Sequence, residues 1–326
     1  MKLTIATLIV AIAAVAAYAQ APTLQIVTAD PNLPSDLFYG NVKVKPLRVR
    51  PGTNPPQFIT IDDADFFTQE QYVDFLSRMP DSSGFQFWLA QITGCGNNAG
   101  CIAAQRVNTS GAFFLSIEFK ETGYLVERMY KTAYGDANQT STFGGSHSLA
   151  VPVIRLSEFV PDVKQIGNGV IVNQGNWQQQ LETNKVAFSQ TFVQRARFTT
   201  AYPTSMAPAT FVDQLFTKVG VTPSTTDRNT AIGEFSGAAD ISDVAARGRA
   251  LRDVAENATL QAQELNRAFV LMQYFGYLRR DPNGGQDTDY TGYDFWLTKL
   301  NQFNGSFINA EMVKAFIESS EYRGRF

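Results

Sequence analysis

The sequence predicts an all-α protein, an array of short amphipathic helices built from diverged internal repeats and preceded by an extended N-terminal arm. Three observations lead to this fold class. Apolar residues recur at helical spacing after residue 62, a motif near residue 78 returns near residue 280, and the chain before residue 62 is rich in proline. With 44% apolar and 17% charged residues, the chain has the composition of a protein that forms a core.

Residues 1–19 predict a signal peptide. Lys2 precedes an apolar run over residues 3–17, and small residues flank Tyr18 at the expected cleavage site after Ala19. The alternative is a membrane anchor, but a bilayer span takes about 20 apolar residues and this run is shorter. We therefore expect export to the extracellular space, the cell surface or the periplasm, with no transmembrane span after cleavage.

Residues 20–61 predict an extended Pro-rich arm or linker. Alternating valine and lysine over residues 42–45 favour a short edge strand that Pro46 closes. Four cations gather there: Lys43, Lys45, Arg48 and Arg50. They suit either an acidic polysaccharide or, as the simpler interpretation, the solvated face of a strand.

Residues 62–326 predict the helical region. Tyr72, Phe75, Leu76 and Met79 follow one helix face, and residues 268–278 hold one polar side chain in eleven, which indicates a central buried helix. Clear repeat units are expected over about 65–119 and 268–326, with eroded units between them.

The repeated motif is the most specific internal signal. Its first copy consists of Arg78, Pro80, Asp81, Gly84 and Trp88, and its second copy of Arg280, Pro282, Asn283, Gly292 and Trp296. We expect the proline to end one helix, the Asp or Asn beside it to cap the next, and the tryptophan to be largely buried between them. The alternative is that the two tryptophans form a platform on which sugars stack.

Longer segments carry a family resemblance. The run YVDFLSRMPDSSGFQFWL, the loop CGNNAGC and the ending FWLTKLNQFNGSFINAEMVKAFIESSEYRGRF resemble the domain of unknown function 4214 family of exported bacterial proteins, over residues 62–326. The resemblance implies an all-helical extracellular module that often occurs in large surface proteins, sometimes beside calcium-binding repeats, with a distant similarity to phycobilisome linker domains. The family has no established catalytic residues to carry over.

Cys95 and Cys101 predict a disulfide. An exported protein meets an oxidising environment, and the glycines and asparagines between the two cysteines allow the chain to turn back. The spacing is not that of a C-x-x-C redox motif. We expect the bond to hold an interhelical turn.

The sequence offers no catalytic residues. His147 is the single histidine and lies in the polar loop GGSHS, where a neighbouring serine can pair with it by chance, and no nucleophile-elbow or zinc-protease motif occurs. Asp281, Asn283, Asp287 and Asp289 alternate in a Gly-containing loop and suit a weak calcium site, although Gly292 stands where an EF-hand has its glutamate. The alternative is an ordinary polar insertion between helices.

These features favour a non-enzymatic extracellular or cell-surface module with a scaffold, matrix or adhesion role. Its expected partner is an extracellular protein or polysaccharide. Nucleic acid is not expected as a partner, because a net charge of −3 gives no electrostatic reason to bind it. The alternative is a secreted hydrolase acting on a cell-wall or environmental polymer, with carboxylates brought together by the fold.

Overall fold

The computed structural model describes residues 24–27, 36–39, 42–44, 48–50, 52–55 and 57–326. The chain divides into two compact units, Met1–Pro46 and Leu47–Phe326. The predicted signal peptide of residues 1–19 lies outside the described residues. Within the described part, no helix is both long enough and apolar enough to span a bilayer.

The first unit contains an antiparallel sheet with the strand order β1 (Leu24–Val27), β2 (Asp36–Tyr39), β3 (Val42–Val44). The strand expected over residues 42–45 is present as β3 and lies at the sheet edge, while Lys45 falls outside the described residues. The prediction of an extended arm therefore describes this segment only in part. Three described segments of the arm form a sheet, in which β2 pairs with a strand on each side.

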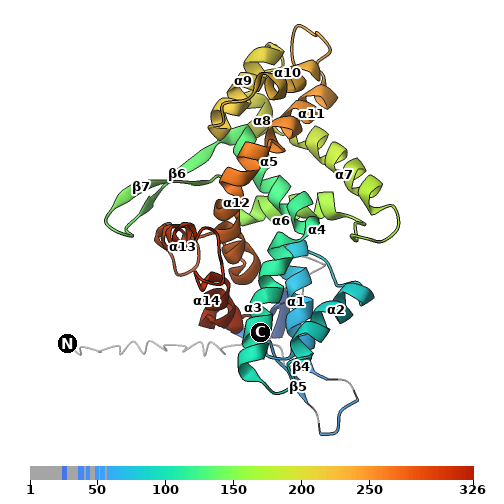
Figure 1. Ribbon diagram of the computed structural model, residues 1–326, viewed down its shortest axis with the longest axis vertical. Coiled ribbons are helices and arrows are strands. Elements are labelled where there is room, and N and C mark those ends of the chain that lie inside the picture. The colour runs from blue at the N-terminus through green and yellow to red at the C-terminus, as the bar shows by residue number, and fades with distance from the viewer. Residues whose placement is uncertain (1–23, 28–35, 40–41, 45–47, 51, 56) are drawn as a thin grey trace, which may run out of the picture. The chain divides into compact units, whose positions relative to one another are not determined.

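The second unit is dominated by helices, which confirms the predicted all-α array (Figure 1). It begins with two short paired strands, β4 (Arg48–Val49) and β5 (Phe58–Ile59). The helices follow as α1 (Ala64–Leu76), α2 (Ser82–Thr93), α3 (Ala99–Leu115), α4 (Ile117–Glu121), α5 (Gly123–Tyr134), α6 (Leu156–Gly167), α7 (Trp177–Phe192), α8 (Ala196–Ala201), α9 (Pro208–Val219), α10 (Thr225–Gly233), α11 (Val244–Ala255), α12 (Ala258–Met272), the π-helical turn η1 (Gln273–Leu278), α13 (Thr291–Gln302), α14 (Met312–Glu318) and α15 (Ser320–Gly324).

The helices follow one another in four groups, α1–α4, α5–α8, α9–α11 and α12–α15, and the first helix of each group ends in the same way. Its terminal residue has a positive φ, at Ser77 (52°), Gly135 (74°), Gly220 (68°) and Arg279 (53°). This residue of positive φ closes the helix and redirects the chain, and at Ser77, Gly220 and Arg279 it is in the left-handed helical conformation. After the first and third of these turns the next helix packs directly against the one just ended, α2 on α1 and α10 on α9.

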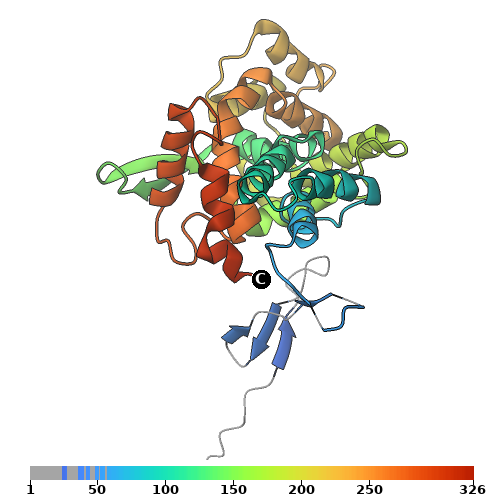
Figure 2. The same ribbon diagram turned by 60° about the horizontal axis from the view of Figure 1, so that its bottom comes forward.

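The first and last helical groups lie side by side, as Figure 2 shows for α1 and the C-terminal helices. Phe75 of α1 meets Tyr277 of η1 edge to face at 5.1 Å, and the Tyr277 hydroxyl donates to Gln71 at 3.1 Å. Phe114 of α3 stacks on Phe269 of α12 at 4.0 Å. The core is therefore continuous between residues that lie about 150 to 200 positions apart.

A β-hairpin is the main departure from the predicted helices. Its strands β6 (Asp136–Ser141) and β7 (His147–Pro152) pair over their whole length and project beside α13 in Figure 1. The polar β6 sequence DANQTS has little strand propensity. Contacts from distant elements hold the hairpin instead: the Tyr290 amide donates to the Thr140 carbonyl at 3.0 Å, and Arg267 binds Asp136 at 2.6 Å.

Candidate binding pocket beside Trp88

The two copies of the motif make the same ionic contact. The Nε and Nη2 atoms of Arg78 donate to the Glu118 carboxylate at 2.6 and 2.7 Å. Arg280 binds Glu321 in the same fork at 2.6 and 3.0 Å. Such two-point ion pairs fix direction as well as distance, so each joins the turn after one helix to the short helix that closes its group.

The aromatic and glycine positions also correspond. Trp88 lies 5.5 Å from Phe113, and Trp296 lies 5.7 Å from Phe316. A Cβ atom added to Gly84 would come within 2.3 Å of the Tyr72 hydroxyl, and one added to Gly292 within 2.5 Å of the Tyr274 hydroxyl. Glycine is therefore required at both positions by close approach rather than by an unusual backbone angle.

The capping prediction is right for one copy and wrong for the other. Asp81 caps α2 by accepting a hydrogen bond from the Gly84 amide at 2.9 Å. Asn283 does not cap α13, whose N-cap residue is Tyr290. Asn283 accepts a hydrogen bond from Arg155 at 2.7 Å instead. Each preceding helix ends at its left-handed residue, so Pro80 and Pro282 follow the helix end rather than cause it.

Both tryptophans of the motif are partly buried. Trp88 and Trp296 pack against the core but stay partly exposed. Each is flanked by the exposed phenylalanine before it, Phe87 at 56% and Phe295 at 37% relative exposure. The indole ring therefore stabilises the packing on one side and is available to solvent on the other.

A pocket of about 420 Å³ lies beside Trp88. It is lined by residues of α1, α2, α3 and α4 and by residues 172–174, and its charged lining residues are Arg78, Asp81 and Glu118. Ile117, 56% exposed, forms part of the rim. The Gln174 amide reaches across to donate to Asp81 at 3.1 Å, which joins the loop before α7 to the start of α2.

Three of the residues that line the pocket have shifted pKa values. Burial lowers the pKa of Arg78, but the hydrogen bonds with Glu118 outweigh burial and raise it overall. Burial raises the pKa of Asp81, but hydrogen bonds from Gly84 and Ser83 outweigh it and lower the pKa overall. Burial, followed by the charge of Asp81, raises the pKa of Tyr72 to about 12. At neutral pH Arg78 is therefore a cation and Asp81 a carboxylate.

The corresponding region of the second copy is covered by its own loop. The segment between proline and tryptophan is six residues longer there. Asp287 accepts a hydrogen bond from Arg280 at 2.7 Å, and Gly285 lies so close that a Cβ atom would be 2.9 Å from the Arg280 side chain. The longer loop thus packs on the arginine that faces the pocket in the first copy.

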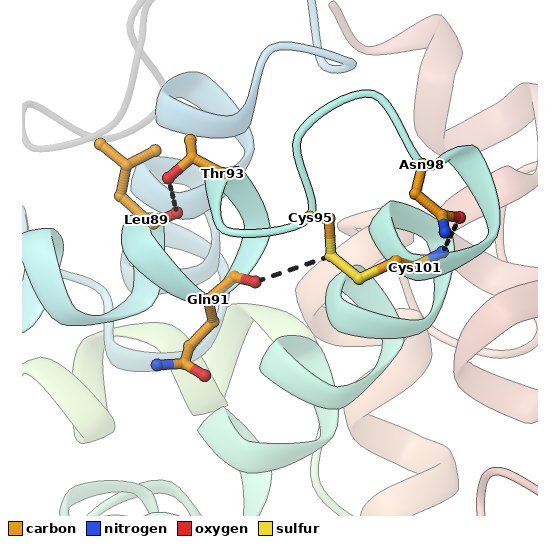
Figure 3. The surroundings of a disulfide bond; sticks show 6 residues. All are labelled: Leu89, Gln91, Thr93, Cys95, Asn98 and Cys101. Carbon is orange, nitrogen blue, oxygen red and sulfur yellow. Dashed lines mark hydrogen bonds between the residues drawn. A yellow bond between two sulfur atoms is a disulfide. The ribbon is translucent and has the colours of Figure 1, made fainter.

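The disulfide prediction is confirmed. Cys95 and Cys101 are bonded, with their Cα atoms 5.6 Å apart (Figure 3). Asn98 caps α3 between them by accepting a hydrogen bond from the Cys101 amide at 3.0 Å. The bond closes the turn between α2, which carries Trp88, and α3, which carries Phe113.

The four residues considered for calcium have separate protein partners. Asp281 accepts a hydrogen bond from the Leu156 amide at 2.9 Å, and Asp289 accepts one from the Thr291 amide at 2.9 Å. Asn283 binds Arg155 and Asp287 binds Arg280. Within the described residues, no three acidic, histidine or cysteine side chains converge as metal ligands would. The loop thus has the contacts of a polar insertion between helices.

His147 begins β7 and joins the hairpin to α13. Its Nε2 atom lies 3.1 Å from Asp294, and its Nδ1 atom lies 2.9 Å from the Gly145 carbonyl. The neighbouring Ser148 donates to Asn138 at 2.6 Å rather than to the imidazole, while Ser141 donates to Asp294 at 2.6 Å. This arrangement anchors the hairpin and does not aim a serine at the histidine as a nucleophile requires.

The sequence did not predict that residues 172–174 line the pocket. The local signal was the amide-rich run from residue 173 to 184, in which glutamine and asparagine surround Trp177. Of the four cations before residue 51, Arg50 follows β4 and pairs with Asp63 at 3.4 Å and also with Asp65.

In the comparisons with known proteins, no family model, no curated protein and no solved structure matches the chain.

Proposed function

We propose that this chain is a non-enzymatic extracellular or cell-surface module that holds a neutral polysaccharide in the Trp88 pocket and so serves a scaffold, matrix or adhesion role. Export through residues 1–19 and membership of the domain of unknown function 4214 family are parts of the proposal. The observation that carries it is the partly exposed indole ring of Trp88 beside a pocket of about 420 Å³ whose lining includes hydrogen-bonding groups.

The chemistry of the pocket suits a sugar. A pyranose ring has an apolar face of C–H bonds, which packs on an indole, and an edge of hydroxyl groups, which bond to carboxylates and amides. Asp81 and Gln174 offer such groups next to Trp88. An acidic polymer suits it less, because Glu118 already neutralises Arg78 and Asp81 adds a negative charge.

The proposal also treats the two ends of the helical region as copies of one duplicated unit. The matched Arg–Glu forks, Trp–Phe contacts and Gly–Tyr contacts support this interpretation. Trp296 then serves as the control for Trp88, because it is the equivalent ring in the copy whose longer loop packs on Arg280.

The test is a binding measurement on the purified exported protein. Titration with cello- and chito-oligosaccharides should give binding that changes little with salt, since the ligands are uncharged. Trp88→Ala should weaken binding by about tenfold or more, while Trp296→Ala leaves it unchanged. Equal binding by the two variants would contradict the proposal, and salt-dependent binding of polygalacturonate alone would point to an acidic partner.

The secreted hydrolase is the second candidate because Asp81 and Glu118 share the pocket. A glycosidase needs one protonated carboxylic acid, whereas the pKa of Asp81 is lowered and Glu118 is bound to Arg78. Release of new reducing ends from the same oligosaccharides would favour the hydrolase over the binding module.

A further inference from the structure

A second pocket lies next to the Trp88 pocket. It has a volume of about 390 Å³ and is built around Trp177 at the start of α7. Gln174 lines both pockets and is tied to the Trp88 side by its hydrogen bond to Asp81 at 3.1 Å. The two pockets therefore share one wall, and each contains one of the three tryptophans of the chain.

The second pocket consists of uncharged groups. Every described residue that lines it is neutral, and amide side chains predominate: Gln174, Asn176, Gln179 and Gln180. Such a surface offers both donors and acceptors but no charge to balance an ion, and burying an unpaired charge is costly. A ligand that suits this surface is neutral and rich in hydroxyl or amide groups.

Local contacts hold the second pocket in shape. The Asn184 amide donates to the carbonyls of Ile166 and Asn168 at 2.8 Å each, which ties α7 to the end of α6. Gln180 donates in turn to Asn184 at 2.9 Å. These hydrogen bonds hold the first turns of α7, which line the pocket, against the end of α6.

We propose that the Trp88 and Trp177 pockets are adjacent subsites for one unbranched neutral oligosaccharide, which crosses the wall at Gln174. This inference rests on the proposed function and adds that the ligand is a chain occupying two sites. Neighbouring sugars of one chain then bind with a high effective concentration at the second site, so affinity grows with chain length.

The experiment measures affinity against length. Cello- and chito-oligosaccharides from dimer to hexamer are titrated into the full exported protein and into Trp88→Ala, Trp177→Ala and the control Trp296→Ala. In the wild type and the control, affinity should rise by about tenfold or more once the oligomer spans both sites. Trp177→Ala should abolish this rise and keep the affinity for the dimer, whereas Trp88→Ala should lose dimer binding.

A second variant guards against misfolding. Gln179 is exposed on α7 and lines the Trp177 pocket, so Gln179→Asp adds a charge there without removing a packed ring. It should also abolish the rise with length. Affinity that depends on Trp88 but not on length or on Trp177 would overturn the two-subsite inference alone. Absence of binding at every length would overturn the inference and the proposed function together.

Discussion

At the scale of single residues, the glycine of the second motif copy is set by one neighbouring atom. In the second copy that atom is the Tyr274 hydroxyl, 2.5 Å from a Cβ built on Gly292, while the next nearest atom is 3.7 Å away. Gly292→Ala should therefore cost about 1–3 kcal/mol of unfolding free energy, because the buried ring has to shift. Chemical denaturation measures this value.

The same clash provides an internal check. Tyr274→Phe removes the clashing oxygen, so the double variant should recover most of the loss in a double-mutant cycle. Additive effects of the two substitutions would show that the close approach is not the cause.

A second residue-scale prediction concerns Glu127 in α5. Its side chain is 1% exposed, and its carboxylate oxygens accept no hydrogen bond from the described residues. Burial, followed by the nearby Glu264 carboxylate, raises the pKa of Glu127 well above its ordinary value of 4.5. The folded state thus favours the protonated acid, and its contribution to stability is complete below pH 4.5 and is lost as the pH rises towards the raised pKa.

Glu127→Gln stays neutral at every pH and isolates this effect. Its unfolding free energy, relative to the wild type, should increase with pH above 4.5, by about 1.4 kcal/mol for each unit of raised pKa that is crossed. Asp253, where burial raises the pKa to about 6, titrates in both proteins and cancels in the difference. A constant difference between pH 4 and pH 9 would refute the prediction.

At the scale of elements, the disulfide fixes the turn between α2 and α3. Cys95 and Cys101 are six positions apart, so closing their loop should contribute about 2 kcal/mol in the chain-entropy model. Protein recovered from the medium or periplasm and then denatured should show no titratable thiol until reductant is added. Two free thiols in freshly exported protein would contradict the disulfide in the exported state.

The hairpin is the element whose anchoring is most easily tested. Asp294 of α13 is 7% exposed and binds both Ser141 and His147 of the hairpin. Asp294→Ala leaves a buried hydroxyl without its acceptor and should cost about 1–3 kcal/mol. Hydrogen exchange should increase chiefly in residues 136–152. Ser148→Ala removes only an exposed cross-strand bond and serves as the control.

At the scale of the helical unit, two arginines near the C-terminus bind two aspartates near the N-terminus. Arg325 meets Asp74 at 2.8 Å, and the Asp74 side chain is fully buried, whereas Arg323 binds Asp62, whose side chain is 54% exposed. Arg325→Ala should cost about 3–5 kcal/mol because it leaves a buried charge unpaired. Arg323→Ala should cost less than about 1 kcal/mol, because exposed ion pairs contribute little.

This comparison tests whether the first and last helical groups form one cooperative structure. Tryptophan fluorescence and circular dichroism should follow the same unfolding transition in Leu47–Phe326, since the core is continuous between α1 and η1. Separate transitions, or equal costs for the two arginine variants, would show that the groups fold independently.

The sequence by itself determined the features that depend on near neighbours. Helical spacing of apolar residues predicted the all-α region. Asp81 was predicted to cap α2, and Cys95 and Cys101 were predicted to form a disulfide across a short turn. These features depend on contacts within a few positions, which local residue types specify.

Only the tertiary structure decided the features that depend on distant partners. The hairpin is held by Asp294, 153 positions from Ser141, because its own residues favour strands weakly. The Trp88 pocket includes Gln174, which lies 93 positions from Asp81 and belongs to a segment outside the motif. A local pattern carries no information about which distant segment will lie opposite it, since that depends on how all the groups pack together.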